Sequence, residues 1–376
     1  MSGRARGDSS TALVDAIGDA EVIVCCGSGG VGKTTTAASI GLHLAGLGRK
    51  VVVVTIDPAK RLADALGLAA GLTNEPQRLT LDDATGATAT TGELWAMMLD
   101  TAATFDGLVK ANAPSPEQAE RILANPFYRN IAGALSGTQE YMAAEKLHAL
   151  HGDARFETVI VDTPPTRNAL DFLEAPGTLA RFLDHPLFRL LMLPTRRGLK
   201  VLNVAAQPLL RTIGKVIGGD VLADAIAFFQ AFEGMETGFR RRADDVMALL
   251  RSDVTRYVLV ASPQEDTVEE ARYFAARLHE AAVDVSALVV NRATPTFPAP
   301  SGRRTKGDAA LWQNLDDLNA TAATERTHLR ALIREVGAAP TVWVPLLGSD
   351  VHDLASLRRI SGLLFDPAED AAGPAS

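Results

Sequence analysis

Cysteine is scarce in this sequence, and its position excludes two kinds of cross-link. The 376 residues contain only two cysteines, Cys25 and Cys26, which are adjacent. Adjacent cysteines cannot form a disulfide framework, and they lack the spacing of a structural zinc site. We therefore expect a protein of a reducing, cytoplasmic compartment.

Long apolar runs and blocks of basic residues are missing as well. The apolar stretches, residues 190–193 among them, fall far short of the ~20 residues that a membrane-spanning helix needs. The first residues lack the apolar core of a secretory signal. With 37 Lys and Arg against 45 Asp and Glu, the formal net charge is −8. We expect no direct membrane span and no nucleic-acid partner.

Short apolar runs alternate with segments of helical periodicity along much of the chain. Unbroken hydrophobicity is typical of strands that are buried on both faces of a parallel sheet. The sequence therefore predicts an α/β fold with a doubly wound, mostly parallel sheet. The predicted strands cover residues 22–26, 51–56, 159–161, 257–261, 287–290 and 341–344.

Two stretches break this alternation. Residues from about 91 to 155 and from 169 to 251 have a helical pattern with few strand signals. Because each stretch leads into the next predicted strand, we interpret them as one α-helical subdomain inserted into a single domain over 21–365. Residues 1–20 are predicted to be an N-terminal extension, and the acidic tail 366–376 is predicted to be disordered.

The most specific motif is a glycine-rich loop between a predicted strand and a predicted helix. Residues 27–34 read GSGGVGKT and fit the phosphate-binding pattern G-x-x-x-x-G-K-[ST]. Glycines let backbone N–H groups surround a phosphate chain without Cβ clashes. The side chain of Lys33 is expected to reach the β- and γ-phosphates, and the hydroxyl of Thr34 to ligate Mg²⁺. The residues expected to line the phosphates are Gly29, Gly30, Val31, Gly32, Lys33 and Thr34.

An aspartate follows each of two further predicted strands. Asp57 comes after the strand at 51–56, at the edge where doubly wound sheets bind ligands, and its carboxylate could orient the water that attacks a γ-phosphate. It could equally belong to an Asp-Pro turn or cap a helix. Asp162 follows the apolar run at 159–161, which is the Walker B pattern of a carboxylate in the Mg²⁺ shell.

These motifs together resemble those of one family. The chain resembles the arsenite-pump and guided-entry (tail-anchored protein targeting) ATPases, a branch of the deviant-Walker P-loop ATPases, and we identify it as a bacterial member. The resemblance implies a P-loop NTPase fold, ATP and Mg²⁺ as ligands, ATP hydrolysis and a dimer. It covers roughly residues 21–365 and rests on the segments 27–39, 55–67, 162–173, 289–292 and 345–357.

The resemblance assigns roles around the phosphates. It implies that Thr35 contacts an inner phosphate, that Asp57 polarises the attacking water and that Asp162 senses the γ-phosphate through Mg²⁺. The expected catalytic residues are therefore Lys33, Asp57 and Asp162. The expected Mg²⁺ site consists of Thr34, Asp57 and Asp162.

The resemblance also implies an adenine pocket. The amide of Asn291 would read the adenine edge, since it offers one donor group and one acceptor. An ordinary asparagine at a strand end is the alternative. The loop at 345–351 would pack on the base through Pro345, Leu347 and Val351.

One position departs from the family's pattern. The family's P-loop has a second lysine just after the first glycine, which reaches the partner subunit's nucleotide, whereas this chain has Ser28. Serine supplies no positive charge for phosphoryl transfer. Hydrolysis could then be slow, a nearby Lys60, Arg61 or Arg167 could substitute, or the chain could pair with a paralogue that keeps the lysine. Homodimers and heterodimers both stay open. The family's zinc clamp and metalloid-binding cysteines are absent too, which disfavours arsenite binding.

The helical stretches hold most of the methionine and phenylalanine. Such side chains either fill a core or line an adaptable groove for hydrophobic helices. We therefore expect an ATPase whose nucleotide state switches a helical region that binds hydrophobic client segments or a membrane protein. The alternatives are a catalytically weak ATP-binding scaffold that pairs with a paralogue, and a partitioning-type spatial regulator.

Overall fold

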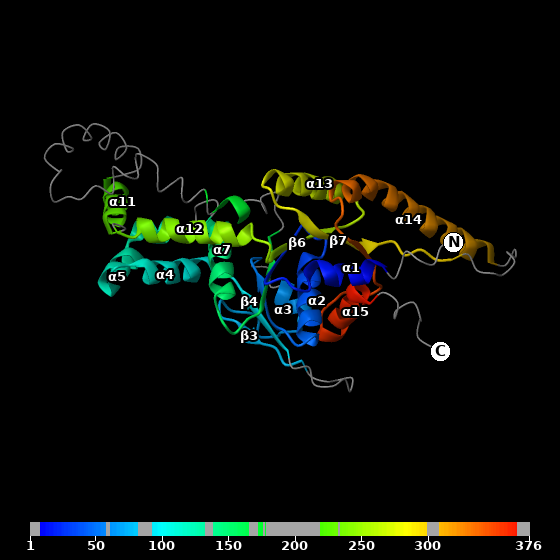
Figure 1. The fold of residues 1–376 in the computed structure, drawn as a ribbon, viewed down its shortest axis with the longest axis horizontal. Helices are drawn as coiled ribbons and strands as arrows, with labels where there is room; N and C mark the ends of the chain where they lie inside the picture. The colour runs from blue at the N-terminus through cyan, green and yellow to red at the C-terminus, as the bar shows by residue number, and fades with distance from the viewer. Residues whose placement is uncertain are drawn as a thin grey trace. The chain divides into compact units, whose positions relative to one another are not determined.

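The chain folds into two compact units, which we call the sheet unit and the helical unit (Figure 1). The sheet unit comprises Met1–Leu99, Leu150–Leu170 and Arg251–Ser376, and the helical unit comprises Asp100–Ala149 and Asp171–Leu250. The computed structural model describes residues 8–57, 61–81, 92–131, 138–164, 172–175, 177, 219–231, 234–298 and 308–366.

The sheet unit is built on an eight-stranded sheet in the order β3-β4-β2-β5-β1-β6-β7-β8. Neighbouring strands are parallel except for the β3–β4 pair, which is antiparallel. This confirms the predicted α/β fold with a mostly parallel sheet, and all six predicted strands are present. The strands are β1 (Val22–Cys26), β2 (Lys50–Thr55), β3 (Gln77–Arg78), β4 (Glu93–Met98), β5 (Thr158–Asp162), β6 (Thr255–Ala261), β7 (Val285–Ala293) and β8 (Thr341–Pro345).

The central strands are buried on both faces, which explains their unbroken apolar sequences. All five residues of β1 and all five of β5 are buried. Side chains that alternate along these strands, such as Ile23 and Cys25, belong to a core shared with helices α1 (Asp8–Ile17), α2 (Lys33–Gly46) and α15 (Leu354–Phe365). Figure 1 shows these three helices close together.

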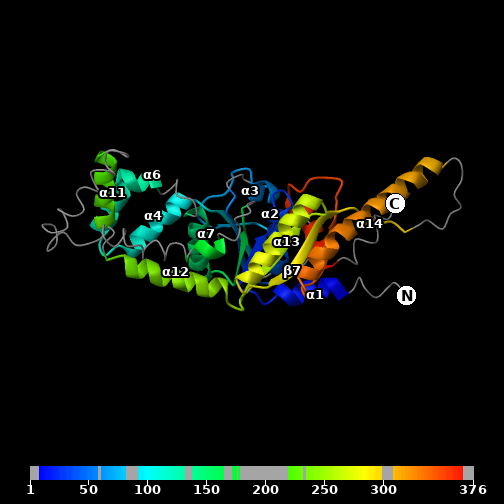
Figure 2. The same ribbon diagram turned by 90° about the horizontal axis from the view of Figure 1, so that it is seen from above.

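Two further helices pack together in the same unit. Helix α13 (Glu265–Glu280) lies beside the 27-residue helix α14 (Ala309–Glu335), as Figures 1 and 2 show. Helix α13 packs on β6, and its buried face carries Val268, Ala271, Phe274 and Leu278. The sheet thus has helices on more than one side, as a doubly wound fold requires.

Two predicted boundaries differ from the structure. Residues 1–20 are predicted to be an extension, but α1 lies within them, and Leu13 and Ile17 are fully buried in the core of the sheet unit. The first helical insert is predicted to begin at about 91, whereas β4 occupies Glu93–Met98 and the helical unit begins at Asp100. Strand β4 pairs with β2, so its burial comes from a tertiary contact that its Trp- and Met-containing sequence does not reveal.

The helical unit has a hydrophobic core of its own. Phe228, Met235 and Phe239 are buried there with Met142 and Tyr128. The described helices are α4 (Thr101–Asn112), α5 (Pro116–Ala124), α6 (Pro126–Ile131), α7 (Thr138–His151, as far as Ala149), α11 (Gly219–Ala231) and α12 (Glu236–Leu250). Much of the second predicted insert segment lies outside the described residues, as does the tail beyond residue 366.

A buried ion pair joins two helices of this unit. The carboxylate of Glu145 in α7 accepts hydrogen bonds from Arg242 in α12 and from the hydroxyl of Tyr141. Glu145 is only 2% exposed. Burial and the adjacent Glu145 carboxylate raise the pKa of Tyr141, so this hydroxyl stays protonated and remains a donor.

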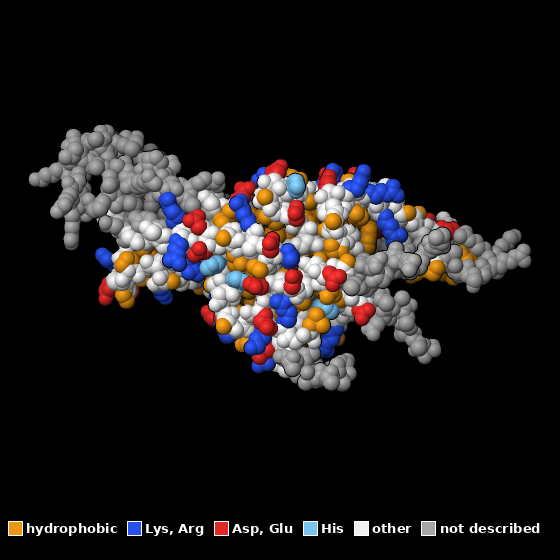
Figure 3. All heavy atoms as spheres, viewed as in Figure 1, with side chains coloured by type: hydrophobic (Ala, Val, Ile, Leu, Met, Phe, Trp, Pro, Cys, Tyr) orange, Lys and Arg blue, Asp and Glu red, His pale blue; other side chains and the backbone are white. Residues whose placement is uncertain are grey.

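Charged side chains of both signs are interspersed over the face shown in Figure 3. In the part of the chain that the structure describes, no helix is both long enough and apolar enough to cross a membrane.

Candidate functional site

Three sequence-predicted features, the glycine-rich loop and the two aspartates, meet at the carboxyl edge of the sheet. Strand β1 lies between β5 and β6, and β2 lies beside β5. The glycine-rich loop follows β1, Asp57 follows β2, and Asp162 ends β5. In the strand register, Asp162 pairs with Cys25 of β1 on one side and with Thr55 of β2 on the other. The parallel register therefore places the loop and both aspartates close together.

The backbone of the loop depends on glycine at defined positions. Gly30 and Gly32 have φ angles of 74° and 95°, which L-residues rarely adopt. A Cβ on Gly27 would lie 2.0 Å from the carbonyl oxygen of Val260, and one on Gly32 would lie 2.1 Å from Nδ2 of Asn291. Gly29 and Gly30 are exposed, and Val31 is buried, so the loop presents its backbone to solvent while one side chain anchors it.

Helix α2 starts directly behind this loop. Gly32 is its N-cap and Lys33 its first residue, followed by the half-buried Thr34 and Thr35. The first N–H groups of an α-helix have no partner within the helix and carry the positive end of its dipole. The loop and the start of α2 therefore form an anion-binding arrangement of the kind that holds phosphates.

The ammonium group of Lys33 lies inside the loop. Its Nζ donates hydrogen bonds to the carbonyl oxygens of Gly27, at 3.0 Å, and Ser28, at 2.8 Å. Burial lowers the pKa of Lys33, and the nearby Asp162 carboxylate opposes this shift. A phosphate in the loop would compensate the desolvated ammonium directly.

The two carboxylate oxygens of Asp162 have different surroundings in the described part of the chain. Its Oδ2 accepts from the hydroxyls of Thr34, at 2.7 Å, and Thr55, at 3.0 Å. Its Oδ1 is buried and has no hydrogen-bond partner among the residues that the structure describes. Burial raises the pKa of this carboxyl to about 6.

This arrangement fits Mg²⁺. Mg²⁺ prefers hard oxygen ligands, and the unsatisfied oxygen of Asp162 lies on the same carboxylate that the Thr34 hydroxyl contacts. Thr34 and Asp162 are two of the three residues that the sequence analysis predicts as the Mg²⁺ site.

Asp57, the third member of that set, pairs with an arginine. Its Oδ2 is 3.6 Å from Nη1 of Arg61, the first residue of helix α3 (Arg61–Ala65). Its backbone N–H donates to the Thr55 hydroxyl at 3.3 Å. The Asp57 side chain is 12% exposed, so a carboxylate with limited solvent access lies beside the loop.

Asn291 in β7 contacts the loop itself. Its Nδ2 donates to the carbonyl oxygen of Val31 at 2.8 Å, and its Oδ1 accepts from the backbone N–H of Arg292 at 2.9 Å. Arg292 has a positive φ of 58°, which this hydrogen bond helps to hold. In this structure Asn291 ties β7 to the loop, a contact that no sequence motif indicates, and its reading of adenine stays a prediction.

The predicted adenine loop begins at the end of β8. Pro345, Leu347 and Val351 are each partly buried, and Leu347 and Val351 pack against the core of the sheet unit. Leu346 is 59% exposed, and its N–H donates to the carbonyl oxygen of Ala293 at 2.9 Å. The contact of this loop with a base stays a prediction.

Ser28 follows the first glycine of the loop, where the sequence analysis expects the family's second lysine. It is buried, and its hydroxyl has no hydrogen-bond partner within the described ranges. Of the three cations considered as substitutes, Lys60 and Arg167 lie outside the described residues, whereas Arg61 lies beside Asp57.

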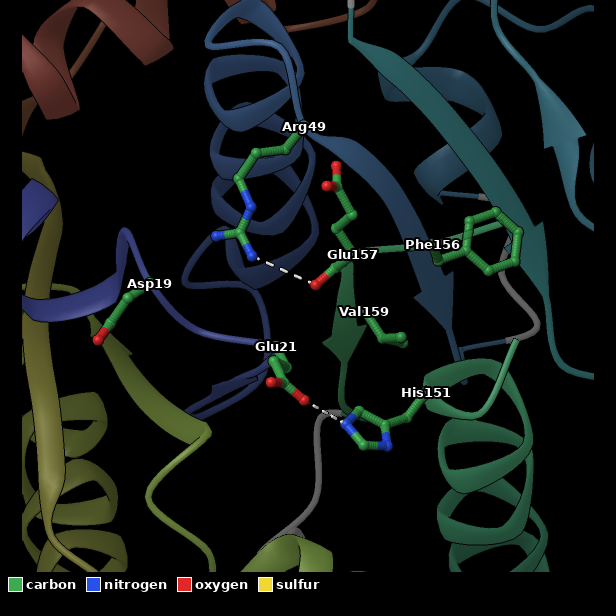
Figure 4. Close-up of a pocket in the computed structure, with 7 residues that line it drawn as sticks. All are labelled: Asp19, Glu21, Arg49, His151, Phe156, Glu157 and Val159. Atoms are coloured by element: carbon green, nitrogen blue, oxygen red, sulfur yellow. Dashed lines mark hydrogen bonds and ion pairs between the residues drawn. The ribbon is translucent and has the colours of Figure 1, made fainter. Parts of the chain in front are cut away.

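A separate cavity of about 350 Å³ lies at the opposite edge of the sheet (Figure 4). Its lining includes Glu21, Arg49 and Glu157, which precede β1, β2 and β5. The Arg49 guanidinium donates to three backbone carbonyls, and His151 contacts the Glu21 carboxylate at 2.7 Å. This cavity is at the amino ends of the strands and is distinct from the glycine-rich loop.

Comparison with known proteins shows the family of this chain. The family model described as "Anion-transporting ATPase" matches residues 20–366. The chain is 27% identical over 354 residues to "ATPase get3" of Sclerotinia sclerotiorum, covering 92% of this chain and 90% of that protein. It is 23% identical over 355 residues to "Putative arsenical pump-driving ATPase 1" of Aquifex aeolicus, covering 92% and 78%. This chain belongs to the anion-transporting ATPase family.

Proposed function

We propose that the protein hydrolyses ATP with Mg²⁺, acts as a homodimer or with a paralogous ATPase, and uses its nucleotide state to switch the helical unit. The observation that carries the catalytic part is the Asp162 carboxylate. Its Oδ2 contacts Thr34, while its buried Oδ1 lacks a partner in the described part of the chain. An unsatisfied oxygen there is expected where a metal ion completes the site.

The roles follow from the contacts around the loop. Lys33 and the N–H groups from Gly29 to Thr34 would hold the phosphates, and Thr34 and Asp162 would hold the metal. Bound Mg²⁺ would neutralise charge on the phosphates. The carboxylate of Asp57 would orient the attacking water, since it lies at the same edge with limited exposure.

The switching part is supported by how the chain is connected. Asp162 ends β5, and the chain re-enters the helical unit at Asp171. Only a short segment of the sequence therefore separates Asp162 from the helical unit. The described Phe and Met side chains of the helical unit are mostly buried in its own core. A client-binding region would consist of other residues or would open in another nucleotide state.

Ser28 favours a second candidate. A scaffold that binds ATP but turns over slowly alone would fit a P-loop without the additional cation, and a lysine-bearing paralogue would then restore its activity. In this candidate the paralogue's lysine would reach the nucleotide bound to this subunit, so this subunit would hold the fast site. Ser28 would supply no charge to the nucleotide bound to the paralogue.

Nucleotide binding and turnover of the purified chain separate these candidates. Lys33→Ala should abolish ATP binding, and Asp57→Asn should bind MgATP but lose turnover. Lys110→Ala, at an exposed position of α4, is the control and should match the wild type. Binding without turnover, relieved by a paralogue, would favour the scaffold. Absence of MgATP binding would contradict both candidates.

A further inference from the structure

Arg61 is placed to act on the nucleotide from within the same subunit. It is the first residue of α3, and its Nη1 lies 3.6 Å from Oδ2 of Asp57. Its side chain is 55% exposed, whereas the Asp57 side chain is 12% exposed. The guanidinium therefore lies on the solvent side of the candidate water-orienting carboxylate.

The backbone beneath Arg61 is firmly held. Leu62 is fully buried, Ala63 is 2% exposed, and both belong to the core of the sheet unit. The two residues that follow Arg61 are thus anchored in the core, whereas the Arg61 side chain is 55% exposed to solvent. A change of side-chain rotamer would move the guanidinium without moving the backbone of α3.

The charge of Arg61 also reaches the phosphate-binding loop. It contributes to the lowered pKa of Lys33, so the guanidinium and the loop ammonium are electrostatic neighbours. Asp57 and Asp162 belong to the same group of interacting charges. A γ-phosphate held by Lys33 would therefore lie within the field of Arg61.

We propose that Arg61 is a catalytic residue that exchanges its ion pair with Asp57 for a contact with the terminal phosphate of bound ATP. The exchange supplies positive charge in cis, at a P-loop where Ser28 supplies none. It also releases the Asp57 carboxylate from this ion pair, so that it can orient the attacking water. This inference rests on the proposed ATP hydrolysis and adds the residue that drives it.

The step balances without a further reactant. The water oxygen forms a bond to the γ-phosphorus while the bond from the γ-phosphorus to the bridging oxygen breaks. The electron pair of that bond leaves with ADP, and the proton of the water passes through Asp57 to the released phosphate. Arg61 contacts the equatorial oxygens, where negative charge is spread in the transition state.

The exchange is favourable because the existing pair is weak. The two charges are 3.6 Å apart and the arginine side chain is 55% exposed, so water partly screens the pair and its contribution is small. A guanidinium binds phosphate oxygens through two parallel N–H groups, a geometry that suits a phosphate better than a single distant contact.

The test compares Arg61→Ala, Arg61→Lys and Arg78→Ala. Arg78 in β3 is a matched control, since its side chain is 60% exposed and paired with Glu93 at 3.1 Å on another strand. For Arg61→Ala we expect kcat to fall roughly 100-fold or more, as for the loss of a charge-stabilising donor or an arginine finger. ADP affinity should change less than about threefold, because ADP lacks the phosphate that Arg61 contacts. Arg61→Lys should recover part of the rate, and Arg78→Ala should match the wild type.

Trapping with ADP and aluminium fluoride, which mimics the transferring phosphoryl group, gives a readout besides turnover. Arg61→Ala should lose this trapped complex while thermal unfolding shows an unchanged fold. Wild-type kcat and trapping in Arg61→Ala would overturn the inference and leave the ATPase function standing. A wild-type chain that binds MgATP but neither hydrolyses it nor forms the trapped complex would overturn the proposed hydrolysis together with the inference.

Discussion

At the residue scale, the buried carboxyl of Asp162 makes stability depend on pH. Burial raises its pKa from 3.8 to about 6, so the folded protein binds this proton more tightly than the unfolded chain does. The free energy of unfolding therefore falls as the pH rises from about 4 to about 6. Without metal, this group lowers that free energy by roughly 3 kcal/mol above pH 6.

Asp162→Asn should consequently raise the melting temperature in EDTA at pH 7.5 and change it little near pH 4. Mg²⁺ with nucleotide should stabilise the wild type but not this variant. Thermal unfolding with and without chelator measures both effects, and Asp64→Asn, at an exposed position of α3, serves as the control. Equal melting temperatures of Asp162→Asn and wild type at pH 7.5 would contradict the role of burial.

Alanine substitutions at Gly30 and Gly32 distinguish the cost of an unfavourable backbone conformation from the cost of a steric clash. Both have positive φ, but a Cβ on Gly30 would meet nothing within 4 Å, whereas one on Gly32 would collide with Asn291. Gly30→Ala should cost about 1 kcal/mol from backbone conformation alone. Gly32→Ala should cost more and should also weaken MgATP binding, because the Asn291–Val31 hydrogen bond must shift. Calorimetric melting and a nucleotide titration measure the pair; a larger loss in Gly30→Ala would be inconsistent with this reasoning.

The residues of the candidate site could be predicted from the sequence where their signal is local. The loop at 27–34 is one short motif, and the aspartates follow recognisable strands. Asn291 donates to Val31 across 260 positions, and Thr55 donates to Asp162 across 107. Such contacts depend on strand order in the sheet, which no local pattern specifies.

At the scale of elements, the ion pair between α7 and α12 gives a sharp prediction. Removing Arg242 leaves the carboxylate of Glu145, which is 2% exposed, with an uncompensated buried charge. We expect Arg242→Ala to lower the free energy of unfolding of the helical unit by roughly 3–5 kcal/mol. Chemical denaturation followed by circular dichroism measures this loss.

The adjacent arginine is the control for that experiment. Arg241 is 86% exposed, and its Nε lies 3.9 Å from the carboxylate of Asp245, so Arg241→Ala should change stability by less than about 1 kcal/mol. The double variant Glu145→Leu with Arg242→Leu should lose less than Arg242→Ala, because it leaves no charge behind. Similar effects of the two single arginine variants would refute this account.

Elements whose burial follows from their own sequence were predicted, and those that depend on a neighbour were not. The strands at 22–26 and 51–56 are unbroken apolar runs, and both form as predicted. Strand β4 has only a partly buried pattern, and α1 is a short helix that is anchored by Leu13 and Ile17. Their places are decided by the sheet and by α15, respectively.

At the scale of the whole molecule, the two units carry separate cores, and fluorescence distinguishes them. All three tryptophans, Trp95, Trp312 and Trp343, belong to the sheet unit, whereas Tyr128 and Tyr141 belong to the helical unit. Tryptophan emission therefore follows unfolding of the sheet unit. Far-ultraviolet circular dichroism follows the helices of both.

Nucleotide binding should stabilise both units if it switches the helical one. MgATP at 100 times its Kd stabilises the state that binds it by about 2.7 kcal/mol, so the tryptophan transition should move to higher denaturant. If the helical unit responds to the nucleotide state, the circular dichroism transition should move as well, because coupling between two sites is reciprocal. Lys33→Ala should remove both shifts. If only the tryptophan transition moves, the sheet unit binds ATP without changing the stability of the helical unit. That outcome favours the scaffold over the switch.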